Sequence, residues 1–110
     1  MSFKELIPHE FTSGSARCYA PMAPGVYGIS NAREWIYIGQ ADGIQAALLG
    51  HLEALNMALI QRLPSGFVFE ICSGNQRQVR QDRLVQEYVP ILNQRLTNQS
   101  QSALRRRQTC

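Results

Sequence analysis

Three short stretches of the chain have the residue types and spacing of β-strands. They cover residues 25–30, 35–39 and 67–72, and they are rich in β-branched and aromatic side chains. Only four residues separate the first two, which favours an antiparallel hairpin. The pattern therefore predicts a small antiparallel sheet of three strands.

Two other stretches have apolar residues at helical spacing. The first helix is predicted to begin at Asp42 as N-cap, with Gln45 completing a capping box, and to stop before Pro64. The second is predicted to open at residues 73–75, to run to Tyr88 and to end at Pro90. The apolar stripe of the first helix is formed by Ile44, Leu48, Leu52, Leu55 and Leu59.

The two ends of the chain predict less regular structure. Residues 1–23 are interrupted by proline and glycine, so we expect an irregular lead-in, with room for one short element. Residues 94–110 are polar and rich in arginine, which is typical of a flexible tail. The expected fold is thus a single α/β domain over residues 24–93, of order β-β-α-β-α, in which helices flank the sheet.

The basic residues are concentrated in the last third of the chain. The 110 residues include 11 basic and 8 acidic side chains, for a net charge of +3. Residues 74–110 hold seven arginines against two acidic residues, which favours a polyanion or an acidic protein as partner. A merely solvated tail is the alternative. The seven are Arg77, Arg80, Arg83, Arg95, Arg105, Arg106 and Arg107.

Several classes of protein are disfavoured by the sequence. No apolar run approaches the roughly 20 residues that cross a bilayer, and residues 1–11 lack the features of a signal peptide. The three cysteines have no zinc-binding spacing and suggest no disulfide framework. We therefore expect a cytoplasmic protein without a membrane partner, and its oligomeric state stays open.

The predicted hairpin carries a paired motif. Gly25-Val26-Tyr27 is followed, ten residues after the tyrosine, by Tyr37-Ile38-Gly39, and the second helix ends in Tyr88-Val-Pro-Ile-Leu-Asn93. With the order of elements, this resembles the GIY-YIG endonuclease family over residues 22–93. The alternative is that both tyrosines are ordinary strand aromatics in a small sandwich.

The resemblance implies metal-dependent hydrolysis of a phosphodiester, with Tyr27 and Tyr37 on one sheet face beside the phosphate. It also implies that His51 and Asn93 are retained site residues. The family's arginine position falls on Ala47 and its metal-binding glutamate position falls on Gln81.

Both substitutions change the chemistry that the resemblance implies. Loss of a preorganised positive group at a phosphate typically lowers the rate by about 10²–10³, and an amide oxygen is a poor sole anchor for Mg²⁺. Helical spacing puts Gln81 on an inward face with Leu84, where it needs a hydrogen-bond partner. The Gln81 amide is either left over from a former catalytic site or makes a hydrogen bond that supports the fold.

The expected function is that of a catalytically impaired module that acts by binding nucleic acid or an acidic protein, without a cofactor. One alternative is an active endonuclease that uses Mg²⁺ or Mn²⁺ in a rearranged site. Its carboxylate would come from Glu70, Asp82 or Glu34, and its phosphate contact from Arg33 or Arg83. Another alternative is a regulatory or inhibitory protein-interaction domain.

Overall fold

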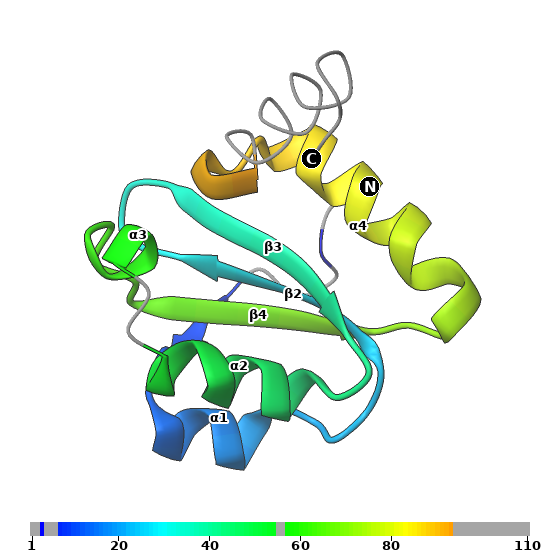
Figure 1. The fold of residues 1–110 in the computed structure, drawn as a ribbon, viewed down its shortest axis with the longest axis horizontal. Coiled ribbons are helices and arrows are strands. Elements are labelled where there is room, and N and C mark those ends of the chain that lie inside the picture. The colour runs from blue at the N-terminus through cyan, green and yellow to red at the C-terminus, as the bar shows by residue number, and fades with distance from the viewer. Residues whose placement is uncertain (1–2, 4–6, 55–56, 94–110) are drawn as a thin grey trace, which may run out of the picture.

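A four-stranded antiparallel sheet forms the centre of the molecule (Figure 1). The computed structural model describes Phe3, residues 7–54 and residues 57–93. The strand order is β1-β4-β2-β3, so β2 is central and β3 is an edge. In chain order, the elements are β1 (His9–Glu10), α1 (Ser13–Tyr19), β2 (Gly25–Ser30), β3 (Trp35–Ala41), α2 (Ile44–Glu53), α3 (Met57–Ile60), β4 (Gly66–Ile71) and α4 (Gly74–Tyr88).

The expectation of three strands was wrong, because the N-terminal segment adds a fourth. His9 of β1 pairs with Phe67 of β4. The same segment also contains α1, whose N-cap Thr12 accepts a hydrogen bond from the Ser15 backbone N–H at 3.1 Å. Both elements have weak sequence signals, since β1 has two residues and α1 buries only Ala16.

The predicted hairpin is confirmed, and it contains a bulge. Ile29 pairs with Tyr37 and Ser30 pairs with Trp35, which leaves Ile36 as the extra residue of β3. A bulge of this kind interrupts the alternation of faces. The neighbours Ile36 and Tyr37 therefore both pack against the same apolar cluster.

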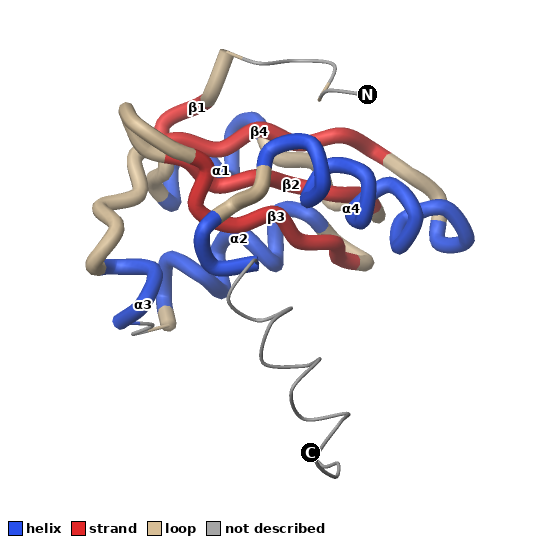
Figure 2. The backbone as a smooth tube through the Cα atoms, turned by 90° about the horizontal axis from the view of Figure 1, so that it is seen from above, coloured by secondary structure: helices blue, strands red, loops and turns tan. Residues whose placement is uncertain are grey.

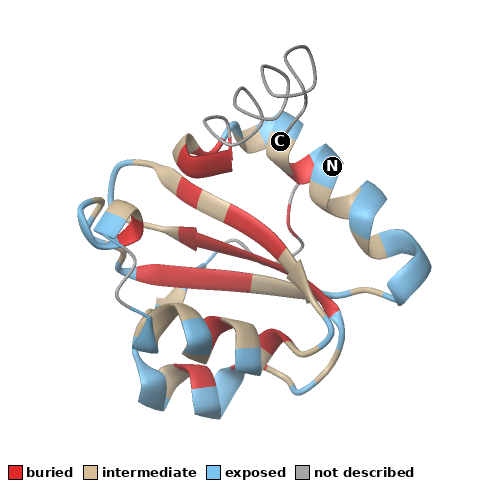
Figure 3. Cartoon of the chain, viewed as in Figure 1, coloured by how far each residue is buried: buried red, intermediate tan, exposed pale blue. Residues whose placement is uncertain are grey.

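Helices cover both faces of the sheet, and each face has its own core (Figures 1 and 2). On one face, Tyr27 and Phe67 pack with residues of α1 and α2, including Ile44 and Leu48. We call this the tyrosine face. On the other, the α4 face, the buried residues are Phe3, Val26, Ile38, Val68 and Leu84. The strands between the layers hold most of the buried residues (Figure 3).

The first predicted helix differs from the observed structure in its start and in its length. The segment forms two helices, α2 and α3, and the N-cap of α2 is Gly43 rather than Asp42. Gln45 makes no capping box. Its side-chain amide donates instead to the Ala20 carbonyl at 3.1 Å and to the Arg17 carbonyl at 3.3 Å, which ties α2 to α1.

The second predicted helix is confirmed as α4. It ends where Val89 takes up a left-handed conformation (φ 48°), directly before Pro90. In the described part of the chain, no helix combines the length and the apolar character that crossing a membrane requires. The predicted flexible tail, with Arg95 and the arginines at 105–107, lies outside the described residues.

Candidate nuclease-like site

Two strands and one helix bring three side chains together on the tyrosine face. The Tyr27 hydroxyl and His51 Nε2 are 2.8 Å apart and share a hydrogen bond. The ring centroids of Tyr27 and Tyr37 are 6.2 Å apart, and each lies 5.6 Å from the His51 ring. We call these three residues the tyrosine–histidine cluster.

The glycines of the paired motif are explained by close packing. A Cβ atom added to Gly39 would lie 2.6 Å from the Tyr27 hydroxyl oxygen and 2.8 Å from the Tyr37 ring. A Cβ added to Gly25 would lie 2.2 Å from the Glu70 carbonyl oxygen. Gly39 therefore lets the tyrosine rings lie against β3, and Gly25 lets β4 approach β2.

Burial sets the protonation of the cluster. It raises the pKa of Tyr27, with Tyr37 adding to the effect, and it raises the pKa of Tyr37. Burial lowers the pKa of His51. The hydroxyls are therefore protonated and the imidazole is neutral near pH 7, and their hydrogen bond is compatible with either histidine tautomer.

The cluster reaches the surface beside His51. An open hollow of about 360 Å³ lies between α2 and α3, and apart from His51 its lining is apolar. His51 thus lines this hollow, while its Nε2 is held by Tyr27.

On the α4 side, Asn93 closes the free edge of β3. Its Oδ1 accepts a hydrogen bond from the Ile38 N–H at 2.6 Å, and its Nδ2 donates to the Ile38 carbonyl at 2.8 Å. Asn93 is buried, with 8% of the residue exposed. It acts as a neighbouring strand would, because it satisfies both backbone groups of Ile38.

Gln81 of α4 binds the same backbone carbonyl. Its Nε2 donates to the Ile38 oxygen at 3.1 Å, and its Oε1 accepts from Gln40 Nε2, also at 3.1 Å. Gln40 donates in addition to Gln78 at 2.6 Å. We call Gln40, Gln78 and Gln81 the amide network. Both functional groups of the Gln81 amide are therefore engaged in bonds that hold α4 against β3.

The donor set around position 81 does not fit a metal ion that depends on carboxylates. Glu70 accepts two hydrogen bonds from Arg80, at 2.8 and 2.9 Å, and the hydrogen bond to Glu70 raises the pKa of Arg80. Asp82 is exposed and accepts from Gln78 at 2.9 Å. Over residues 7–54 and 57–93, no group of three or more His, Cys, Asp or Glu side chains could hold a metal.

The remaining predicted positions are distributed over both helices. Ala47 on α2 packs against the core of the tyrosine face and offers no polar atom. Arg77 is tied to Asp42 at 2.7 Å and Arg80 is tied to Glu70, whereas Arg83 is exposed.

The structure thus joins Tyr27, Tyr37 and His51 directly, and it joins Asn93 and Gln81 through Ile38. Sequence reasoning missed Gln40, the partner of Gln81. A signal was present, because Gln40 lies two residues beyond Ile38 on the same strand and so faces α4.

The comparisons agree with the fold built from these elements. No protein-family model matches the chain, and no curated protein matches it. Among solved structures, the chain is similar to the GIY-YIG N-terminal endonuclease domain of UvrC from Thermotoga maritima bound to its catalytic divalent cation, magnesium. In that match the TM-score is 0.58, the identity is 23%, and the alignment covers 68% of this chain and 91% of the other.

A point mutant of the same domain, also bound to its catalytic divalent cation, matches with a TM-score of 0.57 and 22% identity, and the alignment covers 68% of this chain and 90% of the other. The chain therefore has a GIY-YIG-like fold, as the paired tyrosine motif predicts.

Proposed function

We propose that this protein is a catalytically impaired GIY-YIG-like module that binds nucleic acid. The observation that carries the proposal is the state of position 81. Its amide is bound to the Ile38 carbonyl and to Gln40. A carboxylate there could accept from Gln40 but could not donate to Ile38.

The residues of the tyrosine face support the proposal that the chain binds phosphate groups. Tyr27, Tyr37 and His51 gather hydroxyl and imidazole groups on one face of the sheet, although Tyr27 itself is buried, and such groups bind phosphate oxygens or orient a water molecule. Position 47 brings no cation to that surface. The solved relatives are endonuclease domains that bind a catalytic divalent cation. We infer that the present chain retains affinity for the phosphodiester backbone while lacking the groups that cleave it.

The exposed arginines would supply the electrostatic part of binding. Arg83 is exposed on α4, whereas Arg77 and Arg80 are held by carboxylates in the fold. Contacts of this kind bind the backbone of nucleic acid without reading its sequence.

A cleavage assay on supercoiled plasmid with Mg²⁺ or Mn²⁺ tests the impairment. The unmodified protein should leave the plasmid intact. The double variant Ala47→Arg, Gln81→Glu should gain metal-dependent nicking, and adding Tyr27→Phe should remove it.

A matched control places the same charges on exposed neighbours, as Ala46→Arg with Gln86→Glu, and it should stay inactive. Nicking by the unmodified protein that disappears in Tyr27→Phe would contradict the proposal and favour the active endonuclease. A folded but inactive double variant would show that the residues at positions 47 and 81 are not the cause of the missing nuclease activity.

A titration of fluorescein-labelled duplex DNA at about 50 and about 200 mM salt tests binding itself. We expect affinity to fall steeply with salt. Absence of salt-dependent binding would remove nucleic acid as the partner and leave an acidic protein surface as the candidate.

A further inference from the structure

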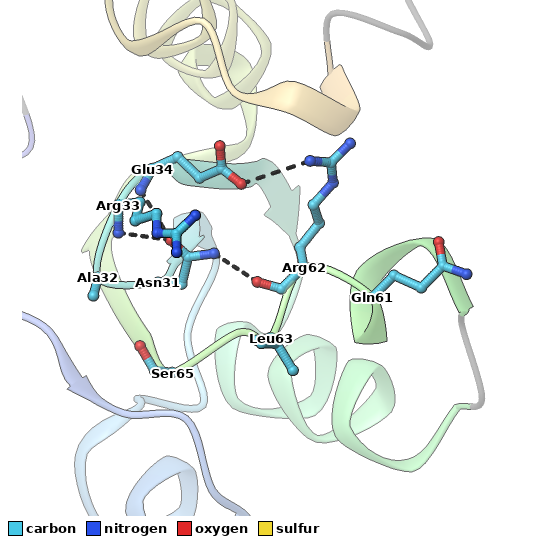
Figure 4. Close-up of a pocket in the computed structure, with 8 residues that line it drawn as sticks. All are labelled: Asn31, Ala32, Arg33, Glu34, Gln61, Arg62, Leu63 and Ser65. Atoms are coloured by element: carbon cyan, nitrogen blue, oxygen red, sulfur yellow. Dashed lines mark hydrogen bonds and ion pairs between the residues drawn. The ribbon is translucent and has the colours of Figure 1, made fainter.

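A second polar site lies at the end of the sheet where the β2–β3 turn meets the segment after α3. An open pocket of about 400 Å³ lies there, and it includes side chains from both segments (Figure 4). Arg33 comes from the turn and Arg62 from the segment after α3. We propose that this pocket is a subsite for a backbone phosphate of nucleic acid. The inference rests on the proposed function and extends it to a defined surface.

The available donors suit an oxyanion. Among the described residues, no carboxylate lies within ion-pair distance of the Arg33 guanidinium, and Arg33 is exposed. Gln61 and Ser65 are the other two polar residues of the lining besides Asn31, Arg33, Glu34 and Arg62. Planar guanidinium groups bind phosphate oxygens in pairs of parallel hydrogen bonds, so two arginines in one pocket favour a phosphate.

The walls of the pocket are braced before any ligand arrives. Asn31 Oδ1 accepts hydrogen bonds from the backbone N–H groups of Arg33 at 2.8 Å and Glu34 at 2.9 Å. Asn31 Nδ2 donates to the Arg62 carbonyl at 2.5 Å. One side chain thus holds the backbones of both arginines at a set separation (Figure 4). Such bracing lowers the ordering cost of binding.

Glu34 is the acidic member of the lining, and it competes weakly for Arg62. Its Oε2 lies 3.8 Å from Arg62 Nη1, and the side chains are 33% and 40% exposed. Ion pairs at that distance and exposure contribute little. A phosphate that takes two hydrogen bonds from Arg62 would replace this contact, and removal of the Glu34 charge should strengthen binding.

The position of the pocket favours a linear polyanion over an isolated carboxylate. Arg33 precedes Tyr37 by four residues, so their Cα atoms lie at most about 14 Å apart even if the segment is fully extended. A nucleic-acid strand that crosses the β3 end of the sheet could place one phosphate at the tyrosine–histidine cluster and another in this pocket.

Fluorescence anisotropy of labelled duplex DNA over a salt series tests the subsite. Arg33→Gln and Arg62→Gln should each weaken binding about tenfold at low salt. Each should also lower the slope of log affinity against log salt by about 0.9, the value for one lost phosphate contact. Glu34→Gln should tighten binding without lowering the slope.

Arg17→Gln is the matched control, because Arg17 is exposed on α1 and the substitution removes the same charge. It should leave the slope unchanged. Circular dichroism melts of all four variants would confirm that they are folded. The subsite is overturned if the unmodified protein binds DNA and Arg33→Gln and Arg62→Gln behave as Arg17→Gln does.

That outcome leaves the proposed function standing, whereas absence of DNA binding by the unmodified protein contradicts the proposed function itself. A poly-glutamate peptide supplies a further arm. Loss of peptide binding in Arg33→Gln and Arg62→Gln, with DNA binding unchanged, would assign the pocket to an acidic protein and overturn the inference.

Discussion

On the tyrosine face, Tyr27 and His51 share a 2.8 Å hydrogen bond, and His51 also lines an open hollow at the surface. On the α4 face, the Gln81 amide is engaged on both sides by Ile38 and Gln40. The first arrangement leaves His51 beside space that is open to solvent, whereas the second uses the amide to hold a helix against a strand. The two groups of predicted site residues thus differ in their surroundings, although they belong to one sheet.

The free energy of unfolding should depend more strongly on a single side chain where β3 meets the end of α4 and Asn93 than on the tyrosine face. Asn93→Ala removes both hydrogen bonds to Ile38, and because Gln81 still binds the carbonyl, the Ile38 N–H becomes the group without a partner. An unsatisfied buried donor costs about 1–3 kcal/mol. With the lost second bond and the cavity, we expect unfolding to become easier by about 2–4 kcal/mol.

Urea denaturation followed by circular dichroism measures this effect. Asn75→Ala, at an exposed position of α4, is the control and should change stability by about 0.5 kcal/mol or less. Equal midpoints for the two variants would show that Asn93 does not hold the edge of β3.

The tyrosine face should respond to added volume. Gly39→Ala puts a methyl group 2.6 Å from the Tyr27 hydroxyl oxygen, against two aromatic rings that cannot both move aside easily. Such overpacking costs about 1–3 kcal/mol. The same denaturation experiment measures the loss.

Gly50→Ala is the paired control, because nothing lies within 4 Å of a Cβ at that position of α2. Alanine is the better helix former, so this variant should gain about 0.5–1 kcal/mol. A neutral effect of Gly39→Ala would mean that the tyrosine rings are not packed tightly over β3.

The smallest expected effect is the pH dependence of the tyrosine–histidine cluster. Burial lowers the pKa of His51 below its ordinary value of 6.5, so the unfolded chain takes up the proton at a higher pH than the folded one. The contribution to stability is complete above pH 6.5 and is lost as the pH falls toward the folded pKa.

Thermal melts between about pH 7.5 and pH 5 should therefore show a loss of stability that is reduced in His51→Gln. His9 is retained in both proteins, so the difference isolates His51. Parallel curves for the two proteins would contradict the burial of a neutral imidazole beside Tyr27.

The helices and strands with strong local signals could be predicted from the sequence. The hairpin follows from its β-branched and aromatic strands, and α4 follows from its apolar spacing and from Pro90. The paired motif, together with the order of elements, predicted the GIY-YIG-like fold by resemblance. The structure adds that Gly39 is required to be small where the tyrosine rings meet β3. Spacing along α4 also predicted that Gln81 faces inward.

Only the tertiary structure showed what those positions contact. Asp42 is of a residue type that favours the N-cap position, but it forms an ion pair with Arg77. Gln45 binds α1 rather than capping α2. β1 exists because β4 offers it a partner, which no local pattern of two residues can reveal.

The sequence by itself determined which residues stand at positions 47 and 81, and hence which chemistry those positions can supply. That the Gln81 amide binds the Ile38 carbonyl, and that Arg33 and Arg62 share a pocket, was decided by contacts between segments far apart in the chain. Local propensity carries no information about such contacts, because their geometry is set when the helices pack on the sheet.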